Sequence, residues 1–129
     1  MTIESSRTAH VIIASTRASA GVYTDRTGPI IADGYIIATR GMRGATIAVN
    51  LDAVAKAKSP ELDFHAIAWK YDQGTPDSCS PVAWGNWLFT VTDDGIARAF
   101  EIATGKQKWK QRLKGDYKAS PVAAEGRIY

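Results

Sequence analysis

The sequence has little of what disulfide-stabilised domains and membrane proteins depend on. It has one cysteine, Cys79, which excludes an intrachain disulfide. No apolar run approaches the ~20 residues that a membrane helix needs. The longest such run near the N-terminus, Val11–Ala14, is also too short for the core of a signal peptide. We therefore expect neither a membrane span nor a signal peptide in this chain.

A strong charge of one sign is also missing, since the formal net charge is only +3. The most regular charge pattern is Lys106–Lys114, where cations alternate with Gln, Trp and Leu. On a β-strand this alternation places all the cations on one face, and Trp109 and Leu113 on the other. One interpretation is a basic stripe for nucleic acid or another anionic surface. The preferred interpretation is a solvated outer strand whose lysines discourage aggregation, because no aromatic residue shares the cationic face. No nucleic-acid partner is predicted.

What the sequence does have is an internal repeat. Trp69 and Trp109 are separated by the same interval as Pro81 and Pro121, about 40 residues, so each tryptophan precedes its proline by the same distance. Three segments superpose without gaps, and each has a turn pair of glycine and a polar residue between two apolar runs. Such pairs favour tight hairpin turns, because these turns need positive φ. The segments are Pro29-IIADGYII, Pro81-VAWGNWLF and Pro121-VAAEGRIY.

The second copy contains two further turn signals, Asp94-Gly95 and Thr104-Gly105, so it predicts four short strands in about 33 residues. The first copy is longer by about 12 residues, which fall between Asn50 and Ala66, and such insertions are expected in loops. A short helix through Ala53–Lys58, capped by Asp52, is expected in this insertion.

A four-stranded antiparallel unit with a period of about 40–50 residues is typical of a β-propeller blade. A helical solenoid of similar period is disfavoured, because the apolar residues recur at period 2 and are rich in β-branched and aromatic types. The predicted fold is therefore all-β, with propeller blades of four antiparallel strands and an incomplete ring in one chain.

The same residues resemble a known family. The run Ala99-FEIATGKQK-Trp109 fits the pattern A-x-D-x-x-T-G-x-x-x-W, with Glu101 in place of the usual aspartate. That pattern belongs to the repeat of quinoprotein dehydrogenase-like propellers, also called PQQ-like repeats. The Ser-Pro-Val segments that begin at Ser80 and Ser120 match the start of the family's innermost strand. The resemblance covers about residues 28–129.

The resemblance implies a structural role for Trp69 and Trp109, which would pack between neighbouring blades against a glycine-containing turn. The family's enzymes oxidise alcohols or sugars with pyrroloquinoline quinone, a calcium ion and an aspartate base. Many other relatives are outer-membrane assembly scaffolds or exported proteins, which suggests an exported or periplasmic parent. None of the cofactor or calcium-binding residues of the enzymes matches a position in this sequence, so no cofactor and no metal are expected.

The repeat pattern divides the chain into four ranges. Residues 1–27 form an N-terminal segment, in which residues 10–16 resemble the outer strand of a preceding blade. Blade one is expected at 28–73 with the loop insertion, blade two at 74–115, and the start of a truncated blade three at 116–129. A closed propeller has about 4–8 blades. The remaining blades are expected from a longer parent protein or from a homo-oligomer.

The favoured function is a non-catalytic binding or scaffold module. Its most unusual loop is Arg40–Gly44, where Arg40 and Arg43 among glycines are candidates for binding an anion. The alternative is part of a quinone-dependent dehydrogenase, which would carry pyrroloquinoline quinone with calcium. A third possibility is a hydrolase whose site forms on assembly. Its candidates would be drawn from the serines and from His10, His65, Asp25, Asp72 and Asp77. Cys79 is expected to be a buried filler rather than a nucleophile.

Overall fold

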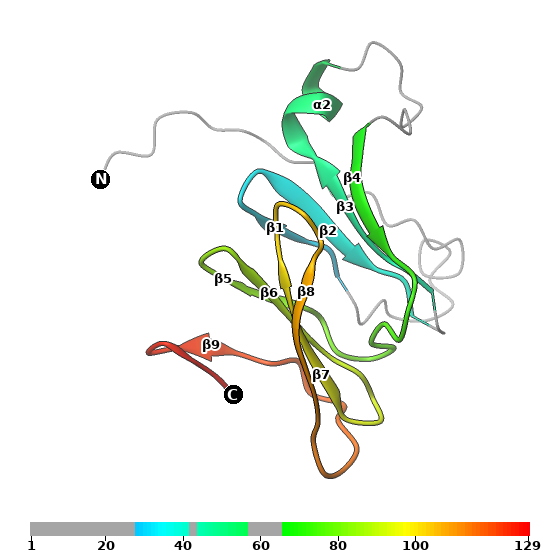
Figure 1. The fold of residues 1–129 in the computed structure, drawn as a ribbon, viewed down its shortest axis with the longest axis vertical. Coiled ribbons are helices and arrows are strands. Elements are labelled where there is room, and N and C mark those ends of the chain that lie inside the picture. The colour runs from blue at the N-terminus through cyan, green and yellow to red at the C-terminus, as the bar shows by residue number, and fades with distance from the viewer. Residues whose placement is uncertain (1–27, 42–43, 57–65) are drawn as a thin grey trace.

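A computed structural model describes residues 28–41, 44–56 and 66–129. It contains two four-stranded antiparallel sheets, and a short hairpin follows them. In the first sheet each strand pairs with the next along the chain (Figure 1). Its strands are β1 (Ile30–Ala32), β2 (Tyr35–Thr39), β3 (Thr46–Asn50) and β4 (Ile67–Tyr71).

The second sheet repeats the same order. Its strands are β5 (Val82–Trp84), β6 (Trp87–Val91), β7 (Ile96–Glu101) and β8 (Gln107–Arg112), and the hairpin that follows consists of β9 (Ala123–Ala124) and β10 (Arg127–Ile128). The predicted fold class is confirmed: the units are four-stranded antiparallel sheets that form an incomplete ring. The sheets lie inside the ranges expected for blades one and two, and the exact boundaries of those ranges stay a prediction.

The three hairpins at the aligned segments use two turn geometries. Asp33 and Gly34 both have positive φ, at 49° and 78°, and so do Glu125 and Gly126, at 51° and 74°. Positive φ at both central residues is the pattern of a type I′ turn. In the middle copy only Gly85 has positive φ, as in a type II′ turn. Glycine at the first position therefore makes the second copy a variant of the same hairpin.

The hydrophobic core lies between the two sheets. Pairing register places Ile37, Ala48 and Trp69 on one face of the β1–β4 sheet. They meet Leu88 and Phe100, which share a face of the β5–β8 sheet, together with Ile102 just after β7. Burial of this shared layer is the main force that holds one sheet against the other.

The helix α2 spans Leu51–Lys56, so it begins before the expected start at Ala53. The cap also differs from the expectation. The side-chain oxygen of Asn50, rather than Asp52, accepts a hydrogen bond from the backbone N–H of Ala53 at 3.0 Å. Asn50 is the last residue of β3, so the chain passes directly from strand to helix, and Asp52 lies in the first turn, where its charge complements the helix dipole.

A β-bulge in each sheet changes the expected alternation along the outer strand. In the second sheet Ala99 pairs with Trp109, but its neighbour Phe100 pairs with Gln107, so Lys108 has no partner of its own. The first sheet skips Ala68 in the same way, between the partners of Ala48 and Val49. The expectation that all cations of Lys106–Lys114 share one face is therefore wrong, because the extra residue interrupts the period-2 alternation.

Some expectations concern residues outside the described ranges. These are the strand at 10–16, Arg43, the end of the insertion, and the candidates His10, Asp25 and His65. In the described part of the chain, no helix is long and apolar enough to cross a membrane.

Candidate functional site

The most tightly built contact is the one that Trp69 makes with the second sheet. Only 9% of Trp69 is exposed, and its indole N–H donates a 2.6 Å hydrogen bond to the carbonyl oxygen of Ile102. Its ring also stacks on Phe100, with centroids 6.5 Å apart and planes 22° apart. A buried tryptophan needs one partner for its N–H, and here the neighbouring sheet supplies it.

The turn between β7 and β8 gives Trp69 the room it needs. Gly105 has a φ of +67°, and a Cβ atom built there would lie 2.5 Å from Cδ2 of the Trp69 ring. Only glycine allows both this backbone conformation and this approach. The bulge at Ala68 lies directly before Trp69, where such a feature re-aims a side chain.

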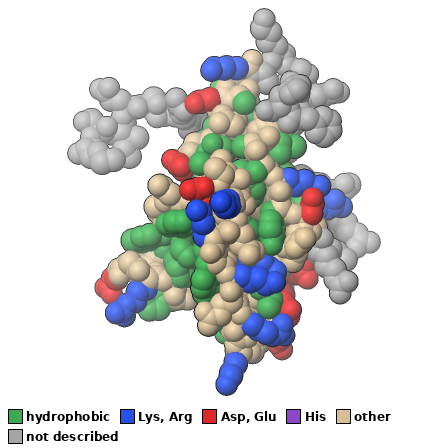
Figure 2. Space-filling model, viewed as in Figure 1, with side chains coloured by type: hydrophobic (Ala, Val, Ile, Leu, Met, Phe, Trp, Pro, Cys, Tyr) green, Lys and Arg blue, Asp and Glu red, His purple; other side chains and the backbone are tan. Residues whose placement is uncertain are grey.

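The structure places Trp109 differently, with 44% of the residue exposed. Register puts it on the face of the β5–β8 sheet that points away from the β1–β4 sheet. Two other exposed tryptophans share this face, Trp84 at 46% and Trp87 at 38%. The strand β9 lies against β5 alongside this face. Figure 2 shows hydrophobic side chains gathered on the side of the molecule where β5 and β9 lie.

The loop between β2 and β3 is held by Thr75, which lies in the connection after β4. The Thr75 hydroxyl lies 2.7 Å from the carbonyl oxygen of Gly44 and 3.0 Å from that of Arg40. The Arg40 N–H donates to the Ala45 carbonyl oxygen at 2.9 Å, which closes the loop. Arg40 is exposed, so its guanidinium is free of the packed interior, and an anion site here stays a prediction.

The carboxylate of Asp93 ties several connections together. Its oxygens accept hydrogen bonds from the backbone N–H groups of Asp77 (3.1 Å) and Ser78 (3.0 Å), and from the Ser78 hydroxyl (2.7 Å). Lys118 adds an ion pair at 2.6 Å. Asp93 thus joins the connection that enters β5 to the one that enters β9.

Repeat symmetry explains this cluster, which we call the Asp93 clasp (Asp77, Ser78, Asp93 and Lys118). Ser78 and Lys118 lie one repeat period apart, so they occupy the same position in successive repeats. A second bond follows the same period, since the N–H of Ser80 donates to the Ser120 hydroxyl oxygen at 2.8 Å. Successive connections therefore lie side by side and are cross-linked by polar contacts.

Two opposing effects act on the pKa of Asp93. Burial disfavours the ionised form, but the bonds from Lys118 and Ser78 stabilise it and prevail, so the pKa lies well below its usual range. The Asp93–Lys118 hydrogen bond in turn raises the pKa of Lys118. The pair is therefore fully ionised at neutral pH.

Replacing Asp93 with asparagine is expected to lower the free energy of unfolding at pH 7 by about 1–2 kcal/mol, because charge-assisted hydrogen bonds are lost. Since the folded-state pKa is lowered, the stabilisation is complete above about pH 4 and disappears as the pH falls further. The difference in free energy of unfolding between Asp93→Asn and the unsubstituted chain should thus shrink in acid. Urea denaturation at neutral and acid pH measures it.

Asp72→Asn is the matched control, because Asp72 pairs with Lys70 at 2.8 Å but both side chains are more than half exposed. Such a pair is expected to contribute at most about 0.5 kcal/mol. The stability lost in Asp93→Asn should depend on pH and exceed the stability lost in Asp72→Asn. A loss that stays constant with pH, or that equals the loss in Asp72→Asn, would contradict the role given to the clasp.

A buried cation lies under the connection that leaves β4. Arg98 is 6% exposed, and its guanidinium donates to the carbonyl oxygen of Gly74 at 2.8 Å. A Cβ atom at Gly74 would come within 2.6 Å of this guanidinium, and Gly74 has a φ of +57°. Arg98 therefore holds the chain at a position where the positive φ and the nearby guanidinium favour glycine.

The residues considered for hydrolysis are not brought together in the described ranges. Asp72 is paired with Lys70, and Asp77 lies beside Asp93. Cys79 is buried, with its sulfur 3.2 Å from the carbonyl oxygen of Ala119. Burial first, and then the charge of Asp93, raise the pKa of its thiol, which opposes formation of a nucleophilic thiolate.

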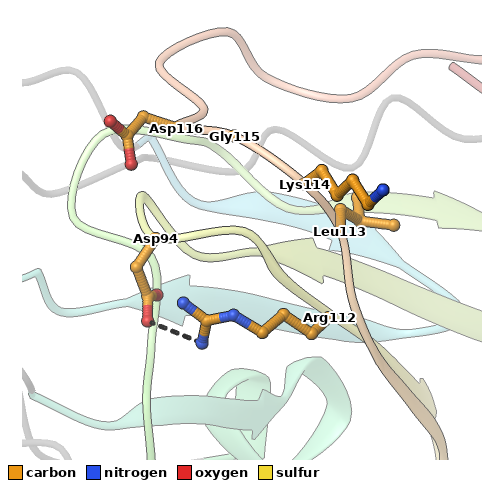
Figure 3. Close-up of a pocket in the computed structure, with 6 residues that line it drawn as sticks. All are labelled: Asp94, Arg112, Leu113, Lys114, Gly115 and Asp116. Carbon is orange, nitrogen blue, oxygen red and sulfur yellow. Dashed lines mark ion pairs between the residues drawn. The ribbon is translucent and has the colours of Figure 1, made fainter.

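The hollow whose lining residues are drawn in Figure 3 is a poor ligand site. It has a volume of about 500 Å³ and lies between the turn that contains Asp94 and the end of β8. Asp94 and Arg112 approach to 3.8 Å across it, and about two thirds of each side chain is exposed. Water competes strongly for charges this exposed, so the hollow offers little binding energy.

Sequence reasoning missed Asp93 and Arg98. The contact between the segments of Ser78 and Lys118 could have been inferred from the sequence, because the two residues are one repeat period apart. Equivalent positions of successive blades are expected to be neighbours. Arg98 had no such signal, since its period-2 position is equally compatible with an exposed face.

A family model described as "Outer membrane protein assembly factor BamB" (PQQ_2) matches residues 64–129, just over half of the chain. The chain belongs to this PQQ-like repeat family. A comparison with curated protein sequences finds no significant match.

Solved structures of PQQ-like repeat proteins share the fold. A europium-containing methanol dehydrogenase has a TM-score of 0.62 and 18% identity, over 79% of this chain and 19% of that one. BamB from Moraxella catarrhalis has a TM-score of 0.58 and 19% identity, over 79% of this chain and 29% of that one. The quinohemoprotein alcohol dehydrogenase ADHIIG from Pseudomonas putida HK5 has a TM-score of 0.59 and 18% identity, over 80% and 16%. The chain thus spans less than a third of the length of each of these structures.

Proposed function

We propose that the chain is part of a non-catalytic propeller that serves as a scaffold or binding module within a larger PQQ-like repeat protein. The observation that carries this proposal is the match of residues 64–129 to a family model that is described as an outer membrane protein assembly factor. The geometry supports it, because the polar side chains of Asp93 and Arg98 bind the connections between strands and sheets. The Asp93 carboxylate, for example, has its oxygens occupied by donors of the chain itself.

The second candidate is a piece of a quinone-dependent dehydrogenase, which the likeness to two dehydrogenase structures favours. Such an enzyme would need side chains that hold calcium and the quinone. Within residues 28–41, 44–56 and 66–129, no three His, Cys, Asp or Glu side chains converge on one point. The described residues therefore do not supply a calcium site by themselves, and the rest of the parent ring would have to provide it.

Quinone binding by the full-length parent protein distinguishes the two candidates, because the described residues of this chain form no calcium site by themselves under either of them. The purified parent protein is expected to reduce no redox dye with methanol, ethanol or glucose when pyrroloquinoline quinone and calcium are present. It is also expected to leave the absorbance spectrum of the quinone unchanged. The same mixture without protein is the control. Calcium-dependent binding of the quinone with a Kd of about 10 μM or tighter, or dye reduction that depends on alcohol, would favour the dehydrogenase instead.

The proposal extends to the assembled state. A further blade is needed to cover the face that carries Trp84, Trp87 and Trp109, because three tryptophans this exposed are typical of an interaction surface. We propose that the parent protein or a second copy of the chain supplies it. The family also leads us to propose an exported or periplasmic parent.

A further inference from the structure

The strand β8 is an unpaired edge with an unusual charge. It is the last strand of its sheet, and all six of its residues are exposed. The stretch from Lys106 to Lys114 carries five cations and no acidic residue. The equivalent outer strand β4 carries one cation, Lys70, which Asp72 already neutralises. The positive charge is therefore particular to the second sheet.

The free backbone groups of this edge belong to the same residues as its cations. Leu113 donates its N–H inward, to the carbonyl oxygen of Gly95 at 2.8 Å. N–H directions alternate along an antiparallel strand, so Arg112 and Lys110 direct theirs away from β7. Within the described ranges no strand pairs on that side. Lys110 and Arg112 thus each offer a backbone donor and a positive side chain, and the charge of Arg112 is partly offset by Asp94 at 3.8 Å.

Packing of neighbouring sheets leaves this edge accessible at Lys110 and Arg112. The first sheet reaches β8 at its start, where the Tyr71 hydroxyl donates to the side-chain oxygen of Gln107 at 3.0 Å. The contacts between β1 and β5, and between β5 and β9, join the first strands of successive units. The edge formed by β8 lies at the opposite end of its sheet, three strands away from β5. A further blade on the tryptophan face would cover the face of the sheet and leave the β8 edge open.

We propose that the outer edge of β8 binds an extended acidic segment of a partner protein, which adds to the sheet as one more strand. Backbone hydrogen bonds would give the affinity, as in other cases of strand addition. The cations would give the selectivity. Edge lysines oppose pairing with neutral or basic strands, and the same lysines favour a strand that carries glutamate or aspartate.

The inference rests on the proposed binding role, since it names a partner for it, but the two fail separately. Loss of the peptide interaction would leave the scaffold proposal standing on the family match. Quinone-dependent activity would overturn the scaffold proposal and leave the edge of β8 unchanged.

The probe is a fluorescent peptide of about eight residues in which glutamate and threonine alternate, long enough to span a strand. Fluorescence anisotropy with the full chain is expected to show saturable binding that weakens as salt is raised. A peptide with lysine in place of glutamate is the control and should not bind. Binding of duplex DNA or anionic vesicles as tight as that of the peptide would overturn the proposal, because charge alone would then suffice.

Two variants at one position separate charge from backbone. Lys110→Gln removes the cation, whereas Lys110→Pro removes the cation and the outward N–H. Proline is tolerated at an edge when its nitrogen faces solvent. Lys110→Pro is expected to weaken binding about tenfold more than Lys110→Gln, which corresponds to one backbone hydrogen bond. Lys70→Gln on β4 is the matched control and should have no effect.

Circular dichroism of each variant checks that the sheets are retained. If Lys110→Pro disturbs the fold, Arg112→Pro against Arg112→Gln repeats the comparison one backbone donor further along. Equal affinity of the proline and glutamine variants at a folded position would contradict strand addition.

Discussion

Replacing Trp69 with alanine is expected to lower the free energy of unfolding by about 3–5 kcal/mol, the usual cost of removing a buried aromatic side chain. The indole fills the space between the sheets, stacks on Phe100 and donates its N–H to Ile102. Its removal leaves a cavity in the shared core and an unpaired carbonyl oxygen. Domains of this size are stable by about 5–15 kcal/mol, so the replacement should remove a large fraction of the total stability.

Trp109→Ala is the matched control, because the two tryptophans occupy the same position in successive repeats. Trp109 is 44% exposed in this chain, so its replacement is expected to cost only about 1 kcal/mol. Urea denaturation followed by circular dichroism measures both variants, since fluorescence changes when a tryptophan is removed. Equal losses for the two variants would contradict the placement of Trp69 in the core between sheets.

The sequence predicted the architecture well because the repeat is locally encoded. Each hairpin is marked by a turn pair such as Asp33-Gly34, and such turns depend only on residues that are adjacent in the chain. The repeat period then placed equivalent strands without any knowledge of long-range contacts. The glycine turn at Gly105 was likewise visible in the repeat pattern.

The features that sequence reasoning missed depend on contacts between distant residues. The bulge at Lys108 leaves no mark in an alternating stretch, because every residue there is compatible with either face. Asp93 lies 15 residues from Ser78 and 25 residues from Lys118, and only the packing of connections brings the three together. The choice of Asn50 over Asp52 as helix cap depends on where β3 ends, which is set by its pairing with β2.

Replacing Gly105 with alanine is expected to lower the free energy of unfolding by about 2–5 kcal/mol, from two effects that add. A φ of +67° is unfavourable for any residue with a Cβ atom, by about 1–2 kcal/mol. The methyl group would also meet the Trp69 ring at 2.5 Å, and inserting one methylene into a packed core costs about 1–3 kcal/mol. Urea denaturation of the full chain measures the sum.

Gly85→Ala separates the two effects, because Gly85 has a similar φ of +55° and a Cβ atom there would meet nothing within 4 Å. It is expected to show the backbone cost alone. The contact with Trp69 is then tested by a double-mutant cycle in which Gly105→Ala is combined with Trp69→Leu, whose smaller side chain leaves room for the methyl group. The steric part of the cost should disappear in the combination, as a coupling of about 1–3 kcal/mol. Strict additivity of the two changes would contradict the docking of Trp69 on the Gly105 turn, since residues in contact are expected to couple.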